Sequence, residues 1–306
     1  MDRITVYAPG SSSNLGAGFD CLGLALAGCG DSVTAVRSPH PGVRVVAASD
    51  PRIPLENTRN TAALAAMAVL RRAGEEFGIE LEIHKGLPLA AGLGGSAASA
   101  VAGAVAAKAL VQTQLSRDNL LAAALEAEAA VSGGRHADNV APSMLGGAVL
   151  VVSQDPLRLT TVRVHPGFSF VLVTPDYAVE TSRARSVLPE AVSRQDAVEQ
   201  AAHLAGLVLG LERGDADLIR DCMTDRIAEP ARAALFPGYL TAFAAGIDAG
   251  AAGVAVSGAG PTLIAVVAGG AATPVANAMV DAFARNGHKA TSRETRVDKA
   301  GARVVD

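Results

Sequence analysis

The chain has 306 residues, half of them apolar and 18% charged, enough for one large or two ordinary domains with real cores. A net charge of −4, 3% aromatic residues and no tryptophan argue against a nucleic-acid partner, which needs basic stripes and stacking platforms. Glycine or charge interrupts every long apolar run, so we expect no membrane span. The 3 cysteines lack C-x-x-C spacing, which favours a reducing, cytoplasmic location over a zinc site or a disulfide framework.

The N-terminal part of the chain is predicted to be rich in strands. Alternating apolar residues predict strands at 3–8, 32–37, 43–48 and 79–84, and a strand at the N-terminus is not a secretion signal. Residues 11–20, SSSNLGAGFD, are interpreted as a loop of small polar residues and glycines that ends on Asp20. We expect a helix over about 59–72, with Asn57 or Thr58 as its cap.

Further along the chain, residues 135–142, RHADNVAP, are interpreted as a loop dense in polar side chains, either a solvated turn or a binding loop. The segment 154–166 is a candidate boundary, which divides the chain into domains at 1–155 and 156–306. Beyond it we expect strands at 159–164, 169–173, 252–256, 263–268, 289–296 and 302–305, and helices at about 194–212, 215–228, 238–249 and 273–287.

A glycine-rich segment, PLAAGLGGSAAS at 88–99, follows the strand at 79–84 and leads into an alanine-rich helix predicted at 97–110. Its three glycines permit positive φ and a close approach of the backbone to a ligand. The first N–H groups of a helix are unpaired and lie at the positive end of its dipole, where phosphate binds readily. The alternative is a tight turn before a well-capped helix, without a ligand.

One carboxylate falls on the apolar face of the helix predicted at 116–131. At 100° per residue, Leu121 and Leu125 lie on one stripe with Glu128 at its centre, whereas Glu126 points to the opposite side. A carboxylate buried there must be paired, protonated or bound to a cation. The alternative is that surrounding alanines make the stripe weak, so that Glu128 is half solvated.

Two common phosphate-binding motifs fail on context. Residues 92–97 match the pattern G-x-G-x-x-A, but a dinucleotide fold needs a second parallel strand after the helix, and a second helix is predicted there. A Walker loop needs a lysine before its Ser or Thr, and the glycine-rich segment contains none.

The sequence resembles the GHMP small-molecule kinases over nearly its whole length. Their signature loop, P-x-x-x-G-L-G-S-S-A-A, matches Pro88 to Ala98, except that Gly95 stands where serine is usual. Segments 8–20 and 257–262 resemble the first and third motifs of the family. The resemblance implies an α+β fold of two domains, an N-terminal ribosomal-S5-like α/β domain and a C-terminal ferredoxin-like α+β domain.

Within this family, four segments resemble the homoserine kinase branch: SNLGAGFD at 13–20, HADNVAP at 136–142, ARSVLP at 184–189, and EPAR at 229–232 with Pro237-Gly238. The resemblance implies an ATP-dependent phosphotransferase that phosphorylates the side-chain hydroxyl of L-homoserine, a step of threonine biosynthesis. The oligomeric state stays open, and a homodimer is one candidate. The alternatives are another alcohol acceptor, or a binding protein that lost the reaction. That last class should show a broken phosphate loop or no metal carboxylate, and the sequence shows neither.

The resemblance implies that the acceptor binds to Asn14, Asp20, His136, Arg185 and Arg232. An aspartate can pair with the ammonium group of an amino acid, and two guanidinium groups can hold its carboxylate with bidentate geometry. For both arginines a surface ion pair is the alternative. The sequence also has an arginine at 183, and the choice between it and Arg185 stays open.

The resemblance further implies ATP and Mg²⁺ as cofactors. The ATP-binding residues would be Asn60, Pro88, Ala90, Gly92, Leu93, Gly94, Gly95, Ser96, Ala97 and Ala98. Ser96 and Glu128 would reach Mg²⁺, which would explain a carboxylate on an apolar helix face. Because glycine keeps the backbone donors, we expect Gly95 to preserve phosphate binding and to lose one hydroxyl contact.

Asn139 looks like the position at which sister kinases such as mevalonate kinase place an aspartate base. An amide cannot usefully accept a proton, but phosphoryl transfer through a loose transition state depends mostly on positioning and charge stabilisation. We therefore predict catalysis without a strong protein base, with Asn139 and Glu128 as the catalytic residues. Asn139 would orient the acceptor hydroxyl, and the loop N–H groups would stabilise the γ-phosphate.

Overall fold

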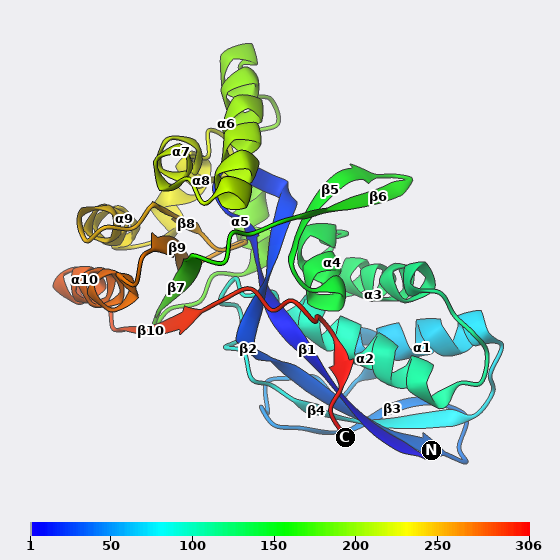
Figure 1. Ribbon diagram of the computed structural model, residues 1–306. Helices are drawn as coiled ribbons and strands as arrows, with labels where there is room; N and C mark the ends of the chain where they lie inside the picture. Colours follow the sequence, from blue (N-terminus) through cyan, green and yellow to red (C-terminus); the bar gives the residue numbers. More distant parts are fainter. Residues whose placement is uncertain (1) are drawn as a thin grey trace.

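The computed structural model describes residues 2–306 and contains two β-sheets with helices packed against them (Figure 1). The first sheet has 7 strands, with β11-β1-β2-β4-β3 in order, β5 paired to β2 and β6 paired to β5. The second sheet has 4 strands in the order β10-β7-β9-β8. The strands are β1 (Arg3–Asn14), β2 (Gly18–Ser38), β3 (Gly42–Ala48), β4 (Gly78–His84), β5 (Ala148–Gln154), β6 (Leu157–Val162), β7 (Phe168–Pro175), β8 (Gly253–Val256), β9 (Leu263–Ala268), β10 (Ala290–Thr295) and β11 (Arg303–Val304).

A long antiparallel hairpin of β1 and β2 forms the centre of the first sheet, and it runs from Arg3 opposite Val36 to Asn14 opposite Gly18. The prediction of a loop at 11–20 is therefore wrong for most of that segment, since its two ends pair with other residues of this hairpin. Strand pairing overrides the weak strand preference of serine and glycine there. The turn itself places Asn14 at a φ of 76°.

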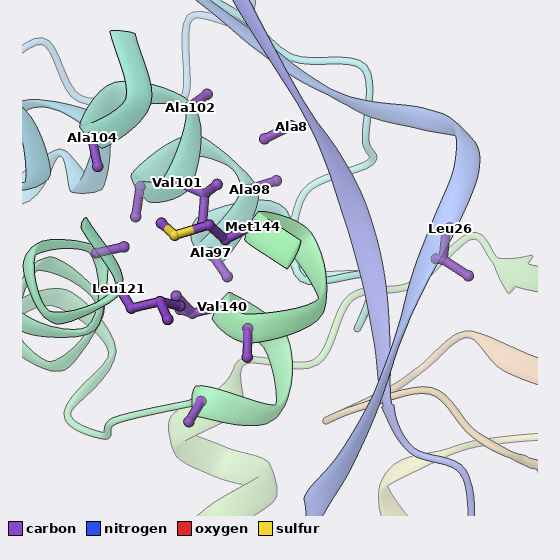
Figure 2. Close-up of a cluster of buried hydrophobic side chains, with 14 of the residues drawn as sticks. Ala8, Leu26, Ala97, Ala98, Val101, Ala102, Ala104, Leu121, Val140 and Met144 are labelled. Carbon is purple, nitrogen blue, oxygen red and sulfur yellow. The ribbon is translucent and has the colours of Figure 1, made fainter. Parts of the chain in front are cut away.

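Four helices lie on one face of the first sheet (Figure 1), namely α1 (Thr61–Ala73), α2 (Gly95–Leu110), α3 (Arg117–Ser132) and α4 (Ala137–Leu145). The alanine-rich α2 lies innermost, where Ala97 and Val101 contact Leu121 of α3 and Val140 of α4 in one buried cluster (Figure 2). A Cβ atom at Gly103 would lie 2.4 Å from the carbonyl oxygen of Ala62, so glycine is required where α1 and α2 cross.

Two local predictions in this half are corrected. Residues 137–142, predicted as part of a loop, belong to α4, in which Pro142 is an internal residue. The proline and the four polar side chains of the 135–142 segment are poor helix signals, and the helix is stabilised by tertiary packing. The cap of α1 is Asn60, whose side chain accepts hydrogen bonds from two N–H groups of the first turn, and neither Asn57 nor Thr58 has this role.

Strands β7, β8 and β9 of the second sheet are buried on both faces, because alternate residues point to opposite sides and other elements pack on each side. In β9, Leu263, Ala265 and Val267 join a cluster with α9 (Tyr239–Asp248) and α10 (Ala272–Arg285). Ile264 and Val266 face the main core, which includes residues of α6 (Arg194–Arg213) and α7 (Ala216–Cys222). The remaining helices are α5 (Thr181–Ser186), α8 (Ala228–Arg232) and the short 3₁₀ segments η1 (Asn57–Arg59) and η2 (Ala233–Leu235).

The helix predicted at 215–228 is shorter than expected, since α7 ends at Cys222. Asp225 is buried and accepts hydrogen bonds from the N–H groups of Ile227, Ala228 and Glu229, which starts α8 as a separate helix. Because Asp225 caps α8, the predicted single helix is divided in two. The sequence alone does not show which N–H groups the Asp225 carboxylate contacts.

The C-terminal end of the chain returns to the first sheet. β11 pairs with β1, so both termini lie at one end of that sheet (Figure 1). β6 also belongs to this sheet, so β6 and β11, which both follow residue 155, pair with strands of the first sheet. The division into domains at 1–155 and 156–306 stays a prediction. Within residues 2–306 no helix has the length and apolar character needed to cross a membrane.

Candidate active site

A cavity of about 290 Å³ lies where the end of the β1–β2 hairpin, the glycine-rich loop, α3, α4, α5 and α8 meet. The predicted site residues that line it are Asn14, Asp20, Asn60, Pro88, Ala90, Gly92, Leu93, Gly94, Gly95, Ser96, Ala97, Glu128, His136, Asn139, Arg185 and Arg232. Ala98 does not line the cavity; it is fully buried in the core beneath the loop. The structure therefore gathers residues that are far apart in sequence around one cavity.

The glycine-rich loop connects β4 to the first turn of α2 and bends sharply at three residues with positive φ: Ala90 at 51°, Gly92 at 76° and Gly94 at 64°. A Cβ atom at Gly94 would lie 2.1 Å from the Ser11 hydroxyl oxygen, so only glycine fits there. Gly94 is the N-cap of α2, and within residues 2–306 this helix has no side-chain cap for its first N–H groups. These donors are available to an anion in the cavity.

Gly95 differs from the other glycines of the loop because its φ is not positive. A Cβ atom there would lie 3.4 Å from Nζ of Lys85, an ordinary van der Waals distance. We expect Gly95→Ser to fold and to bind ATP at least as well as the wild type, because serine fits this backbone and adds a hydroxyl group. Calorimetric titration with ATP checks this, and loss of binding would contradict it.

Glu128 is buried in the cavity wall, with 4% of its surface exposed. Its Oε1 lies 3.3 Å from Nδ1 of His136, while its Oε2 has no hydrogen-bond partner. Within residues 2–306 there is no cluster of three or more His, Cys, Asp or Glu side chains suited to a metal. One unpaired carboxylate oxygen beside a phosphate-binding loop nevertheless fits Mg²⁺, which protein sites often hold through one or two carboxylates plus substrate phosphates.

On the opposite, exposed side of α3, Glu126 forms ion pairs with Arg71 and Arg72 of α1 at 2.5 and 2.9 Å. The opposite orientations predicted for Glu126 and Glu128 are thus confirmed. The alternative of a half-solvated Glu128 is wrong, because α1, α2 and α4 all pack around α3.

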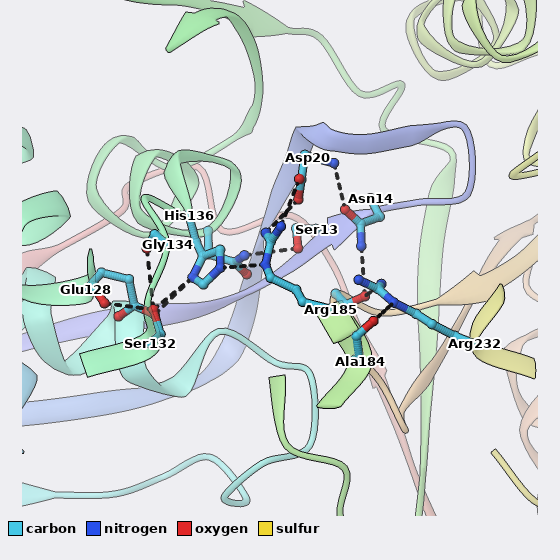
Figure 3. Close-up of polar contacts among 12 residues, drawn as sticks. Ser13, Asn14, Asp20, Glu128, Ser132, Gly134, His136, Ala184, Arg185 and Arg232 are labelled. Atoms are coloured by element: carbon cyan, nitrogen blue, oxygen red, sulfur yellow. Dashed lines mark hydrogen bonds and ion pairs between the residues drawn. The ribbon is translucent and has the colours of Figure 1, made fainter. Parts of the chain in front are cut away.

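A chain of polar contacts joins Glu128 to the hairpin end (Figure 3). Nε of Arg185 donates to Nε2 of His136 at 3.2 Å, so this ring nitrogen must be an acceptor and the ring proton is assigned to Nδ1, on the side of Glu128. The Arg185 guanidinium then forms a bidentate pair with Asp20, at 2.9 and 3.1 Å. The neighbouring Arg183 is exposed and does not line the cavity.

Arg232 is 3% exposed and donates to the backbone oxygens of Ala184 at 2.9 Å and Gly258 at 3.2 Å. Burial, followed by the positive charge of Arg185, lowers the pKa of its guanidinium. Asn14 donates to the same Gly258 oxygen at 2.7 Å (Figure 3). The Arg232 guanidinium is bonded only to neutral backbone oxygens, so together with Arg185 it is suited to binding an anion.

Asn139, in the first turn of α4, lies between the hairpin and the glycine-rich loop. Its Oδ1 accepts a hydrogen bond from the Ser11 hydroxyl, and its Nδ2 donates to the Ser13 hydroxyl, both at 3.0 Å. The same Oδ1 is 3.1 Å from the position of a Cβ at Gly94. The amide is therefore held rigidly at the junction of the phosphate-binding loop and the charged cluster.

Asn60 lines the cavity, but its side-chain groups are engaged. Oδ1 accepts from the N–H groups of Ala62 and Ala63, and Nδ2 donates to the Pro54 oxygen at 2.8 Å. Asn60 thus shapes the wall near Pro54 by capping α1. Its predicted place beside the adenine stays a prediction.

The sequence predictions missed several residues of the cavity wall, including Lys85, Asp138 and Thr181. Asp138 lies inside the HADN segment, and burial followed by the negative charge of Asp20 raises the pKa of its carboxyl to about 6. Lys85 directly precedes the glycine-rich loop. Both Asp138 and Lys85 could have been predicted as wall residues, because each is a charged residue within or next to a recognised motif.

Glu229 braces α8 against the second sheet. Its carboxylate accepts from the Tyr239 hydroxyl at 2.7 Å and from the N–H group of Val256 at 2.8 Å. Burial raises the pKa of Glu229 from 4.5 to about 7, although these two hydrogen bonds lower it. This residue therefore orients the helix that carries Arg232.

We expect Glu229→Gln to become more stable relative to the wild type as the pH rises from 5 to 8. Between pH 4.5 and about 7 the unfolded wild-type chain releases a proton that the folded protein retains, so its free energy of unfolding falls. Glutamine can accept from the N–H group of Val256 through its amide oxygen and donate its amide N–H to the Tyr239 hydroxyl, and it does not titrate. Urea denaturation of both proteins at the two pH values measures this, and a difference independent of pH would contradict the assignment.

Two family models match the chain: GHMP kinases N terminal domain at residues 60–147, and GHMP kinases C terminal at residues 207–285. The chain belongs to the GHMP kinase family and is an ATP-dependent kinase that phosphorylates an alcohol. Its curated relatives include homoserine kinases. One from Xylella fastidiosa is 41% identical over 303 residues, 98% of this chain and 93% of the relative. One from Arabidopsis thaliana is 38% identical over 314 residues, 99% of this chain and 85% of the relative.

Solved structures agree with this grouping. The crystal structure of homoserine kinase from Cytophaga hutchinsonii superposes with a TM-score of 0.95 at 38% identity, covering 100% of this chain and 98% of that one. L. major mevalonate kinase, at 15% identity and a TM-score of 0.69 over 96% of each chain, shares the fold. The predicted two-domain GHMP kinase fold is thus confirmed.

Proposed function

We propose that this chain transfers the γ-phosphoryl group of ATP to the side-chain hydroxyl of L-homoserine and releases O-phospho-L-homoserine for threonine biosynthesis. One observation carries the proposal. A glycine-rich loop at a helix N-terminus and a cluster of Asp20, Arg185 and Arg232 face the same cavity. Phosphate and the two charged groups of an amino acid are the ligands that these ends would bind. Relatives at about 40% identity that carry the name homoserine kinase support this acceptor.

The acceptor end of the cavity already contains one pair of opposite charges. An amino acid zwitterion carries the same pair, so its ammonium group can replace the guanidinium beside Asp20 while its carboxylate takes the place of Asp20 beside Arg185. Arg232 would complete the carboxylate site, because backbone oxygens fix its guanidinium without neutralising it. Asn14 and His136 would also bind the acceptor. His136 accepts a hydrogen bond from Arg185, and Asn14 donates to the Gly258 oxygen that Arg232 also contacts.

At the other end, the N–H groups of the loop and of the first turn of α2 would bind the ATP phosphates. Mg²⁺, when bound to Glu128 and Ser96, would neutralise charge on those phosphates. Asn139 would orient the acceptor hydroxyl for in-line attack, and no strong protein base is needed in a loose transition state. Buried apolar side chains, including Leu93 and Ala97, form part of the cavity wall.

We expect Arg185→Gln to raise the KM for homoserine by roughly a hundredfold while the KM for ATP changes by less than about twofold. The variant loses the two charge-assisted hydrogen bonds that a substrate carboxylate would receive. Arg183→Gln is a matched control, because Arg183 is exposed on the same short helix. A larger effect at Arg183 than at Arg185 would contradict this assignment, and steady-state kinetics with each substrate varied distinguishes the cases.

Phosphorus NMR of a reaction with ATP and L-homoserine tests the product directly, since a phosphate monoester on the side chain gives a new signal coupled to the adjacent methylene protons. A different alcohol acceptor is the second candidate. It would be favoured if the monoester signal appeared with another alcohol and not with L-homoserine. A homodimer and a cytoplasmic location stay predictions. Three free cysteines support a reducing compartment.

A further inference from the structure

The glycine-rich loop rests on a buried ion pair that the sequence predictions did not include. Asp31 of β2 is fully buried, and the side chain of Lys85, which follows β4, is 6% exposed. Ser32 pairs with His84 in the sheet, so Asp31 and Lys85 lie side by side one position further along. Their ion pair points towards α2, where Ser99 and Gly95 complete a network.

All three protons of the Lys85 ammonium group are used in this network. Nζ donates to Asp31 Oδ2, to the backbone oxygen of Gly95 at 2.9 Å and to the Ser99 hydroxyl oxygen at 3.0 Å. An ammonium group has only three donors, so none is left for a phosphate. Lys85 lines the cavity, but its charge and donors are directed at the protein.

The carboxylate of Asp31 is satisfied as well. Its Oδ1 accepts from the N–H group of Gly86 at 3.1 Å, and its Oδ2 accepts from the Ser99 hydroxyl at 2.8 Å in addition to Lys85. The network therefore ties two strands of the sheet to the first turn and a half of α2. A closed network of this kind fixes geometry, because any shift breaks several buried hydrogen bonds.

We propose that Lys85, neutralised by Asp31, is a positioning residue for the phosphate-binding loop. Its contact with the Gly95 oxygen fixes the first residue of α2, whose neighbouring N–H groups are the donors for ATP phosphates. The inference rests on the proposed role of the loop in ATP binding.

The test uses the double variant Lys85→Met with Asp31→Asn, because removing one partner would leave a buried charge unpaired. Its affinities for ATP and for adenosine are measured by displacement of a fluorescent nucleotide. We expect ATP to bind about tenfold or more weakly, while adenosine, which has no phosphate, binds as in the wild type. Lys108→Met, at the far end of α2, is the matched control and should change neither affinity.

Unchanged ATP affinity in the double variant would overturn the proposal. An equal loss of affinity for ATP and adenosine would also overturn it, because Lys85 would then act on adenine binding or on the structure in general. If the double variant does not fold, Ser99→Ala decides: it keeps the ion pair, and a selective weakening of ATP by about threefold is expected. Equal ATP affinity in that variant would overturn the proposal. These measurements need no turnover, so a failure of homoserine phosphorylation would be seen separately.

Discussion

Replacing Asn139 with leucine is expected to lower kcat by on the order of 10²-fold while the KM for ATP stays within about threefold of the wild-type value. Leucine has nearly the same shape as asparagine, so the packing of α4 against the hairpin should survive. What is lost is an amide fixed by hydrogen bonds to Ser11 and Ser13. An interaction used to orient the acceptor hydroxyl acts on the transition state more than on nucleotide binding.

The measurement is steady-state kinetics with ATP and homoserine varied independently, together with a thermal unfolding midpoint to show that the variant folds. A kcat equal to that of the wild type would remove Asn139 from the catalytic residues. A parallel increase in the KM for ATP would mean that the amide acts chiefly through Gly94 and the phosphate-binding loop.

Glu128→Gln is expected to raise the Mg²⁺ concentration that gives half-maximal activity by roughly tenfold and to lower kcat by about 10²-fold. Glutamine can still accept the hydrogen bond from His136, so the chain of contacts to Arg185 is preserved. The change removes the negative charge and alters the one oxygen, Oε2, that has no partner in the protein. The variant therefore separates a metal carboxylate from a purely structural one.

Glu126→Gln is the matched control, since it lies two residues away on the exposed side of α3 and forms ion pairs only with Arg71 and Arg72. Surface pairs of this kind contribute about 0–1 kcal/mol, so we expect its activity and metal dependence to match the wild type. Titration of ATP binding against Mg²⁺ gives a second reading that does not need turnover. An unchanged metal dependence in Glu128→Gln would exclude Glu128 from the metal site.

Local patterns in the sequence were sufficient to predict the glycine-rich loop and to single out the carboxylate of Glu128. Gly92 and Gly94 have positive φ, a backbone conformation that a glycine in the sequence indicates directly. Glu128 could be found because a charge at the centre of an apolar helix face is a local contradiction that burial must resolve. The acceptor residues were predicted from motifs, and the fold shows why they occur together: three elements far apart in sequence meet around Gly258 and Asp20.

Features that depend on distant partners could not be predicted in the same way. The ion pair of Asp31 and Lys85 joins residues that are 54 positions apart, and each alone looks like a charge at a strand end. The helix α4 was missed because Pro142 and its polar neighbours are poor helix signals, and only packing on β1, β2 and α2 stabilises it. In both cases tertiary contacts supply what local propensity lacks.

The central claim is that the cavity selects homoserine as the acceptor for the phosphoryl group of ATP. A coupled assay of ATP consumption with L-homoserine, serine, threonine and mevalonate tests it most directly. We expect homoserine to give the highest kcat/KM, by roughly tenfold or more over serine, which is one methylene shorter, and by more over mevalonate, which has no ammonium group for Asp20. ATP turnover that is independent of the alcohol, or faster with mevalonate than with homoserine, would contradict the claim.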